Sequence, residues 1–252
     1  MAESATILIP DISGYTEFLT KTELVHSSHI INELLEAILA ANDNDFVLSE
    51  VEGDALLLYR KGTPIEADAL VRQCVGMFES FHKQIKIIER DSLCQCGACK
   101  TASNLSLKFI AHHGTVQEIK VMQFTKCSGL DMVVAHRLLK NRIPSDEYIL
   151  VTPSCFEVAS LEQAPGALAW ERSSEEYPAI GTVQYQHAPL AGVRKTIPDP
   201  APRPSPAPRT ASRSKRSRCC SPRGPIRMRR RPMARRCCIR PSPRGRCRSS
   251  TP

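Results

Sequence analysis

The sequence predicts an α+β domain with a mostly antiparallel sheet and helices on one face, followed by a tail that lies outside the fold. Two observations lead to this class. Short apolar runs alternate with longer segments whose apolar residues recur every three or four positions, which gives the order β-α-β-β-α-β-β-α-β. The composition then changes abruptly after residue 200, where Arg, Pro, Ser and Cys supply 39 of the last 52 residues.

Each element follows from a local pattern. The apolar run Ala5–Ile9 predicts a buried strand, and apolar residues on one face predict helices over 23–41 and 66–89. The segment 46–59 predicts a hairpin that turns at Gly53, because glycine tolerates a positive φ. Further strands are expected at 105–112, 116–124, 148–151, 167–172 and 182–186, with helices at 131–141 and near 154–160.

The charge is divided between the domain and the tail. The chain has a net charge of +8, but the last 52 residues carry 16 Arg and one Lys with no acidic residue, so the first 200 residues carry −9. Nucleic-acid binding is therefore not expected of the domain. No apolar run is long enough for a membrane span and no secretory signal is evident, which indicates a cytoplasmic protein with reduced thiols.

The tail, residues 196–252, has two interpretations. Its arginines are typical of a segment that binds nucleic acid or membranes, and its composition is also that of a GC-rich gene translated out of frame. We favour the second interpretation because adjacent Cys pairs are unusual in natural basic tails. In either case the proline content prevents helix and sheet, so disorder is expected.

Two carboxylates form the strongest candidate site. Asp11 ends the first expected strand, and Asp54 follows the hairpin glycine. Neighbouring strands would bring both to one spot, where carboxylate oxygens suit Mg²⁺ or Mn²⁺ if substrate phosphates supply further ligands. The alternative for either residue is a turn or cap role. Four following backbone amides lead toward a helix and are expected to face phosphate oxygens: Ser13, Gly14, Tyr15 and Thr16.

The strings around these residues resemble a known family. ILIPDISGYTEF resembles the opening of class III adenylate and guanylate cyclases, whose first strand ends in a metal-binding Asp. EVEGDALLLY resembles their hairpin with its second metal-binding Asp, and GLDMVVAHRLL resembles their dimer-face helix. The order and rough spacing agree across about residues 5–190. CQCGACKTASNLSLKF and AHRLLKN resemble an uncharacterised bacterial domain-of-unknown-function family in that superfamily.

This resemblance implies a ferredoxin-like nucleotide-cyclase sandwich over residues 1–195, a homodimer and a purine nucleoside triphosphate as ligand. Carried over by position, it makes Asp11 and Asp54 the ligands of two Mg²⁺ or Mn²⁺ ions and Ile12 a carbonyl contact to metal. Arg137 matches the arginine that acts on the transition state. Two functions stay open: a nucleotide cyclase, and a catalytically inactive module that binds nucleotide and metal or only dimerises in signalling.

The sequence departs from the family pattern at three places. The catalytic Asn falls on Val133, which cannot hydrogen-bond a ribose, and the polar residue after the first glycine of the helix string falls on Leu130. No Lys occurs between Lys140 and Lys195 to bind phosphate. These differences favour the inactive module, whereas the intact Asp pair favours the enzyme.

Two further positions do not settle the choice of purine or the role of the helix. Glu50 matches the purine-selecting position, but its partner position falls on about Lys126, so ATP and GTP are not distinguished; Glu50 is alternatively a solvated strand residue. His136 lies beside Arg137 and either replaces a missing polar group near the phosphates or packs in the dimer interface.

Three cysteines form a second candidate site. Cys94, Cys96 and Cys99 have the spacing C-x-C-x-x-C, and thiolates at this spacing can share Zn²⁺. The alternatives are redox-active thiols and inert loop cysteines. The candidates for a fourth ligand are His112, His113 and Cys127, although a histidine at a strand end is more often a core residue with its hydrogen bonds satisfied.

Overall fold

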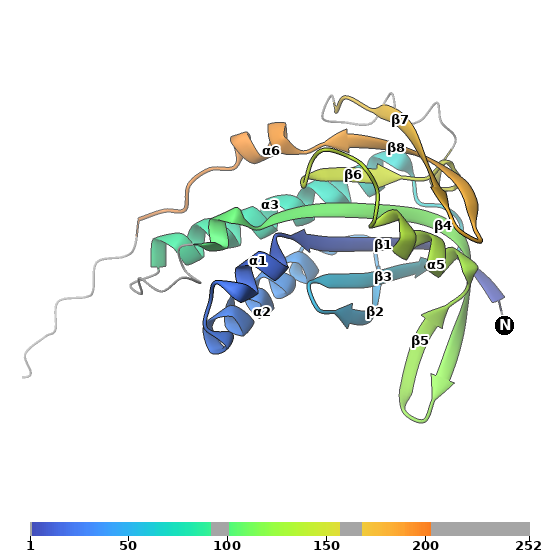
Figure 1. The fold of residues 1–252 in the computed structure, drawn as a ribbon, viewed down its shortest axis with the longest axis horizontal. Helices are drawn as coiled ribbons and strands as arrows, with labels where there is room; N and C mark the ends of the chain where they lie inside the picture. Colours follow the sequence, from blue (N-terminus) through green and yellow to red (C-terminus); the bar gives the residue numbers. More distant parts are fainter. Residues whose placement is uncertain (1, 92–100, 157–167, 203–252) are drawn as a thin grey trace, which may run out of the picture. The chain divides into compact units, whose positions relative to one another are not determined.

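The computed structural model describes residues 2–91, 101–156 and 168–202. Its centre is an eight-stranded sheet with the order β2-β3-β1-β4-β6-β8-β7, in which β5 pairs with β4 (Figure 1). Among the described strands, β4 and β6 form the one parallel pair, so the expected mostly antiparallel sheet is confirmed. The strands are β1 (Ala2–Ser13), β2 (Val47–Glu52), β3 (Ala55–Lys61), β4 (Ser106–Val121), β5 (Phe124–Ser128), β6 (Tyr148–Val151), β7 (Glu171–Tyr177) and β8 (Gly181–Pro189).

Successive side chains of each strand point to opposite faces of the sheet, so the core has two layers. Leu8 and Phe109 face the layer with the long helices α2 and α3, and we call this side of the sheet the α2/α3 face. Ile7 and Ile9 point to the opposite side, the α5 face, where α5 packs. The expected α+β class is confirmed, with α5 as the exception to helices on one face (Figure 1). The helices are α1 (Tyr15–Thr20), α2 (Leu24–Ala40), α3 (Ala67–Asp91), α5 (Leu130–Leu138) and α6 (Ala191–Thr196), with 3₁₀ turns η1 (Ala102–Asn104) and η2 (Pro153–Cys155).

The helices and the first hairpin form where the local pattern predicts them. The apolar stripe of α2 is buried against the sheet at Ile31, Leu34 and Ile38. Gly53 has φ 66° in the turn between β2 and β3, a conformation that glycine adopts without steric cost. None of the described helices is both long and apolar enough to cross a lipid bilayer.

One strand replaces two expected ones. The sequence predicts separate strands at 105–112 and 116–124, but β4 runs without interruption through Gly114 and turns at Met122, which has φ 53°. Gly114 allows this because a Cβ atom there would lie 2.2 Å from Cγ of Asp131. The amide of Thr115 donates to Oδ2 of Asp131 at 2.6 Å, so β4 is held against the start of α5.

The end of the described chain packs along α3. Ile197 is buried, and Nζ of Lys86 donates to its carbonyl oxygen at 2.6 Å. Arg194 of α6 lies 2.6 Å from Oε1 of the buried Glu147, which also lies 3.4 Å from Nε2 of His82 on α3. Burial lowers the pKa of His82, so this histidine tends to be neutral in the core. The sequence pattern did not predict α6.

Candidate functional site

Asp11 and Asp54 come together at the ends of neighbouring strands. Asp11 lies opposite Ala55, the first residue of β3, and Asp54 directly precedes Ala55 in the hairpin turn. The amide of Ile12 donates to the carbonyl oxygen of Asp54 at 3.1 Å, which joins the two backbones at this point. Because side chains alternate along a strand, Asp11 shares the α5 face with Ile9. The expected carboxylate pair is therefore adjacent in the fold.

A lysine that the sequence analysis missed shares this site. Nζ of Lys108 lies 3.0 Å from Oδ2 of Asp11, and both side chains are about five-sixths buried, with 17% and 16% exposed. Burial raises the pKa of Asp54, and the charge of Asp11 raises it further, while Lys108 acts in the opposite direction. The pair thus holds more negative charge than one ammonium group offsets. In the sequence, the one indication of this role was that Lys108 is the single Lys in the apolar segment 105–112.

The segment after Asp11 forms the expected turn into a helix. Gly14 has φ 88° and its carbonyl accepts the first helical hydrogen bond of α1, from Phe18 at 2.9 Å. Ile12 is buried, and α1 has only six residues. The hydroxyl oxygen of Ser13 is buried without a hydrogen-bond partner among the described residues. Phosphate binding by the amides of this segment stays a prediction.

A second group of ionisable side chains lies on the same face. Oε1 of Glu50 lies 2.7 Å from Nζ of Lys126, and Oε2 of Glu52 lies 3.4 Å from Nδ1 of His136 on α5. The candidate ligand atoms of Glu50, Glu52 and His136 lie within 4.8 Å of one another. Burial and the neighbouring Glu50 raise the pKa of Glu52. For Glu50, burial acts to raise the pKa, but its contacts with Lys126, Glu52 and His136 together outweigh burial, and the pKa is lowered.

The two positions that the sequence aligned with purine selection are therefore joined to each other. Lys126 already neutralises Glu50, so a cation would have to displace the lysine before it could bind that carboxylate. Lys108 pairs with Asp11 in the same way, but Asp54 has no ion-pair partner among the described residues, so the Asp pair keeps one carboxylate available to a divalent ion.

Helix α5 presents Arg137 at the surface. Its guanidinium has no ion-pair partner in the described ranges of the chain, and it lies one turn from Val133, whose side chain is 45% exposed. The opposite side of the helix is buried through Met132, Ala135 and Leu138. Arg137 is thus free to reach a ligand or a second chain, while Val133 offers that surface no hydrogen bond.

The adjacent histidines are satisfied within the fold. Nδ1 of His112 lies 2.8 Å from Oγ1 of Thr152, and Nε2 lies 3.1 Å from Oδ1 of Asp131. His113 contacts Thr6 and Ser4 through its two ring nitrogens, at 3.0 and 2.7 Å. The expectation that either is a fourth Zn²⁺ ligand is therefore not favoured. Cys94, Cys96 and Cys99 lie outside the described residues.

Large apolar side chains are exposed on the hairpin formed by β4 and β5. Val121, Met122 and Phe124 are 62%, 84% and 69% exposed, and we call these three residues the hairpin patch. Figure 1 shows this hairpin projecting from the sheet. Leu130 on α5 is 68% exposed as well. Exposed apolar clusters of this kind are typical of protein–protein interfaces.

Parts of the chain match known proteins. Residues 31–148 match a family described as "Protein of unknown function (DUF2652)". Over 120 residues the chain is 34% identical to uncharacterized protein Rv2561/Rv2562 of Mycobacterium tuberculosis (strain ATCC 25618 / H37Rv), a match that covers 48% of this chain and 56% of that relative. The chain thus spans about half the length of this curated relative.

Solved structures identify the fold. The guanylate cyclase domain of RhGC from Catenaria anguillulae, in complex with GTP, matches with a TM-score of 0.53 and 16% identity, over 75% of this chain and 97% of that one. Adenylyl cyclase CyaB from P. aeruginosa matches with a TM-score of 0.52 and 14% identity, over 75% of this chain and 94% of that one. The chain has the fold of nucleotide cyclase domains.

Proposed function

We propose that residues 1–195 form a nucleotide-cyclase-like domain that binds a purine nucleoside triphosphate through divalent metal ions at Asp11 and Asp54. The observation that carries the proposal is the adjacency of these two carboxylates at the ends of β1 and β3. The likeness to a guanylate cyclase domain in complex with GTP supports the class of ligand.

The donor set fits Mg²⁺ or Mn²⁺. Carboxylate oxygens are the ligands that these hard cations prefer. The raised pKa of Asp54 indicates that burial and Asp11 disfavour a second negative charge here, and a cation relieves both effects. Lys108 supplies part of that positive charge to Asp11 in the metal-free protein. Bound metal would supply charge neutralisation to the triphosphate and lower the pKa of the attacking ribose hydroxyl.

The chain's own residues complete the site from two protomers. The backbone of Ile12 and the turn at Gly14 hold the segment that faces the phosphates, and Ser13 offers an unpaired hydroxyl there. Arg137 comes from the partner subunit and stabilises negative charge on the transition state. We assign the hairpin patch and Leu130 to the homodimer interface, because they expose large apolar side chains and Leu130 is on α5, the helix that carries Arg137.

A catalytically inactive nucleotide- and metal-binding or dimerisation module is the second candidate. Val133 favours it, because the exposed face of α5 lacks a hydrogen-bonding side chain at the position of the catalytic Asn. The absence of a Lys between Lys140 and Lys195 acts in the same direction. In the enzyme and in a nucleotide-binding module, the nucleotide and the metal bind at the same carboxylates. The free thiols of Cys74, Cys127 and Cys155 support a cytoplasmic location.

The test is to incubate the purified chain with Mn²⁺ and ATP or GTP, and to measure both cyclic product by chromatography and the melting temperature. Cyclic product selects the enzyme. A rise in melting temperature without product selects the inactive module, since a ligand that binds only the folded state stabilises it. No rise at millimolar Mn²⁺ and nucleotide rejects both nucleotide-binding possibilities and leaves a module that only dimerises. Asp45→Asn is a matched control, because Asp45 is exposed and its φ of 56° suits Asn.

A further inference from the structure

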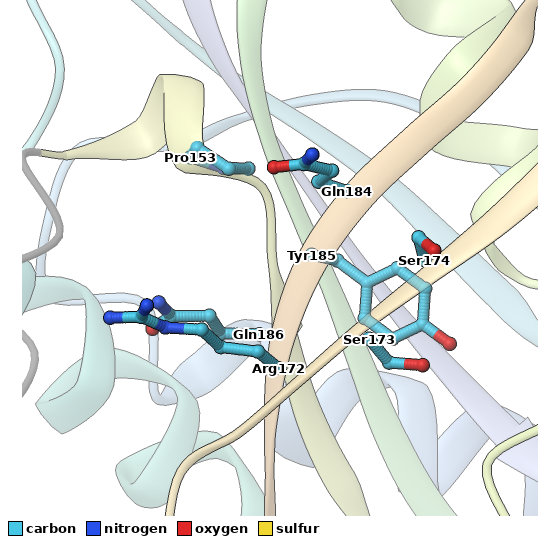
Figure 2. A pocket seen from close by; sticks show the side chains of 7 residues that line it. All are labelled: Pro153, Arg172, Ser173, Ser174, Gln184, Tyr185 and Gln186. Atoms are coloured by element: carbon cyan, nitrogen blue, oxygen red, sulfur yellow. The ribbon is translucent and has the colours of Figure 1, made fainter.

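An open pocket of about 360 Å³ lies at β7, β8 and η2. Its lining includes Pro153, Arg172, Ser174, Gln184 and Gln186. In Figure 2 the side chains of Arg172 and Gln186 extend side by side, while the ring of Tyr185 points to the other side of β8. Cavities of 300 to 1,000 Å³ are typical of small-molecule sites, so about 360 Å³ can hold a small metabolite.

This cavity opens on the α2/α3 face, away from the carboxylate pair. Gln186 lies opposite Val151 of β6 on one side and opposite Arg172 of β7 on the other. Val151 belongs to the core layer under α2 and α3, and directly opposed residues of paired strands share a face. Asp11 points to the α5 face, so the cavity and the proposed nucleotide site lie on opposite sides of the sheet.

Two polar groups that line the pocket have no complementary partner among the described residues, and one of them, Arg172, is exposed to solvent. Gln186 is only 8% exposed, and its side-chain amide makes no hydrogen bond to any described residue. The amide atoms face the pocket and are not sealed from solvent, so the amide is available to a ligand. Beside it, the guanidinium of Arg172 has no carboxylate partner within the described ranges. By contrast, the neighbouring Glu171 faces His187, with Oε2 3.7 Å from Nε2.

We propose that this cavity binds a small molecule that carries a phosphate or carboxylate group. Arg172 pairs with the oxyanion, for which the planar fork of a guanidinium is well suited. The amides of Gln186 and Gln184 and the hydroxyl of Ser174, all on the same face, hydrogen-bond the remaining polar atoms of the ligand. The ligand thereby pairs with the amide of Gln186, which makes no hydrogen bond to a described residue.

Trp170 provides a local reporter for the test. It is the single Trp of the chain, it is partly buried against the core layer under α2 and α3, and it lies two residues before Arg172. We would titrate the full chain with inorganic phosphate and, separately, with succinate, while following Trp170 emission and the heat of binding. Sodium chloride at equal ionic strength gives the baseline. A saturable response to one of the two anions, with a midpoint in the millimolar range, is expected and identifies the oxyanion.

Variants decide whether this response belongs to the cavity. Arg172→Gln and Gln186→Leu should each raise the midpoint about tenfold or more, because each removes a charge-assisted contact to the ligand. Arg142→Gln makes the same charge change at a side chain that is 91% exposed, and should leave the midpoint unchanged. Asp54→Asn should also leave it unchanged, because that residue belongs to the other face.

Two outcomes would overturn the proposal. One is that both cavity variants, with melting temperatures like that of the wild type, titrate as the wild type does. The anion then binds elsewhere, for example to the Arg-rich tail that every variant retains. The other is the absence of both a heat and an emission change with either anion.

Discussion

Lys108 of β4 lies directly opposite Asp11 of β1, with its Nζ atom 3.0 Å from Oδ2 of the aspartate. The lysine therefore occupies part of the space in which a cation would meet the carboxylate pair. In the metal-free protein it stabilises Asp11, and it competes with any divalent ion that binds there. This relationship makes the site's charge balance directly testable.

Replacing Lys108 with Met should separate these two effects. The apo melting temperature should fall by about 2–5 °C, because the largely buried side chain of Asp11 then lacks its ammonium partner. The additional rise in melting temperature with Mn²⁺ and nucleotide should become larger than in the wild type. Differential scanning calorimetry measures both quantities, with the exposed Lys120→Met as control. An unchanged or smaller shift would mean that Lys108 does not compete with metal.

Asp54 should make the apo protein less stable as the pH rises. Its pKa is raised in the folded state by burial and by Asp11, so between the unfolded and folded pKa values the folded chain binds more protons. Stability therefore falls as pH increases through that window and is greatest below it. Asp54→Asn should flatten this dependence and raise the apo melting temperature at pH 7 by about 1–3 °C.

The same variant should abolish the shift caused by Mn²⁺ and nucleotide, and so should Asp11→Asn. A stability loss of about 0.5–2 kcal/mol in these variants, with no metal effect in the wild type, would instead identify both residues as caps or turn residues.

The hairpin patch should hold the homodimer together. Phe124→Glu should raise the dimer dissociation constant by at least about tenfold, because it places a charge in an apolar interface. Light scattering over a concentration series measures this effect. Val25→Glu is the matched control, since Val25 is 78% exposed on α2. A wild type that stays monomeric at high micromolar concentration would exclude the two-protomer site.

The Cys94, Cys96 and Cys99 loop should bind Zn²⁺, which thiolates favour. Elemental analysis of protein purified without chelator should find about one Zn per chain, and a triple Ser variant should lose it together with part of the local stability. A metal-free wild type that melts at the same temperature as the triple variant would leave these residues as inert loop cysteines.

A chain that ends at Pro202 should fold without the tail. Nζ of Lys86 contacts Asp199 at 2.9 Å, and the guanidinium of Arg90 donates to the carbonyl of Ala201 at 2.6 Å, so the chain is needed to this point. We expect a single cooperative melt within about 2 °C of the full chain. A chain ending at Lys195 loses the buried Ile197 and should be less stable by about 1–3 kcal/mol.

Sequence patterns predicted those parts of the fold whose causes are local. The periodic apolar residues of α2 and the glycine turn at Gly53 act over a few residues, and both were placed well. The continuity of β4 depends instead on Asp131, which lies 17 residues after Gly114 in the sequence and fills the space beside it. No window around Gly114 contains that information.

The candidate site divides in the same way. Asp11 and Asp54 could be paired from a resemblance over a whole segment, because that resemblance already contains the strand order. Lys108 could not, since its role depends on which residue of β1 it faces. A one-residue shift of that register would have placed it on the opposite side of the sheet.

The uninterrupted strand β4 connects the carboxylate site to the hairpin patch. Lys108 lies near one end of the strand and Val121 at the other, 13 residues away, which at about 3.3 Å per residue is roughly 43 Å. Val121 of the hairpin patch and the lysine that contacts Asp11 therefore belong to one continuous strand. Deleting one residue between Gly114 and Val121 would turn the Val121 side chain to the opposite face of the strand while leaving Lys108 in place. The position of the hairpin patch relative to the carboxylate site thus depends on the number of residues in β4, although Lys108 and Val121 are not in contact.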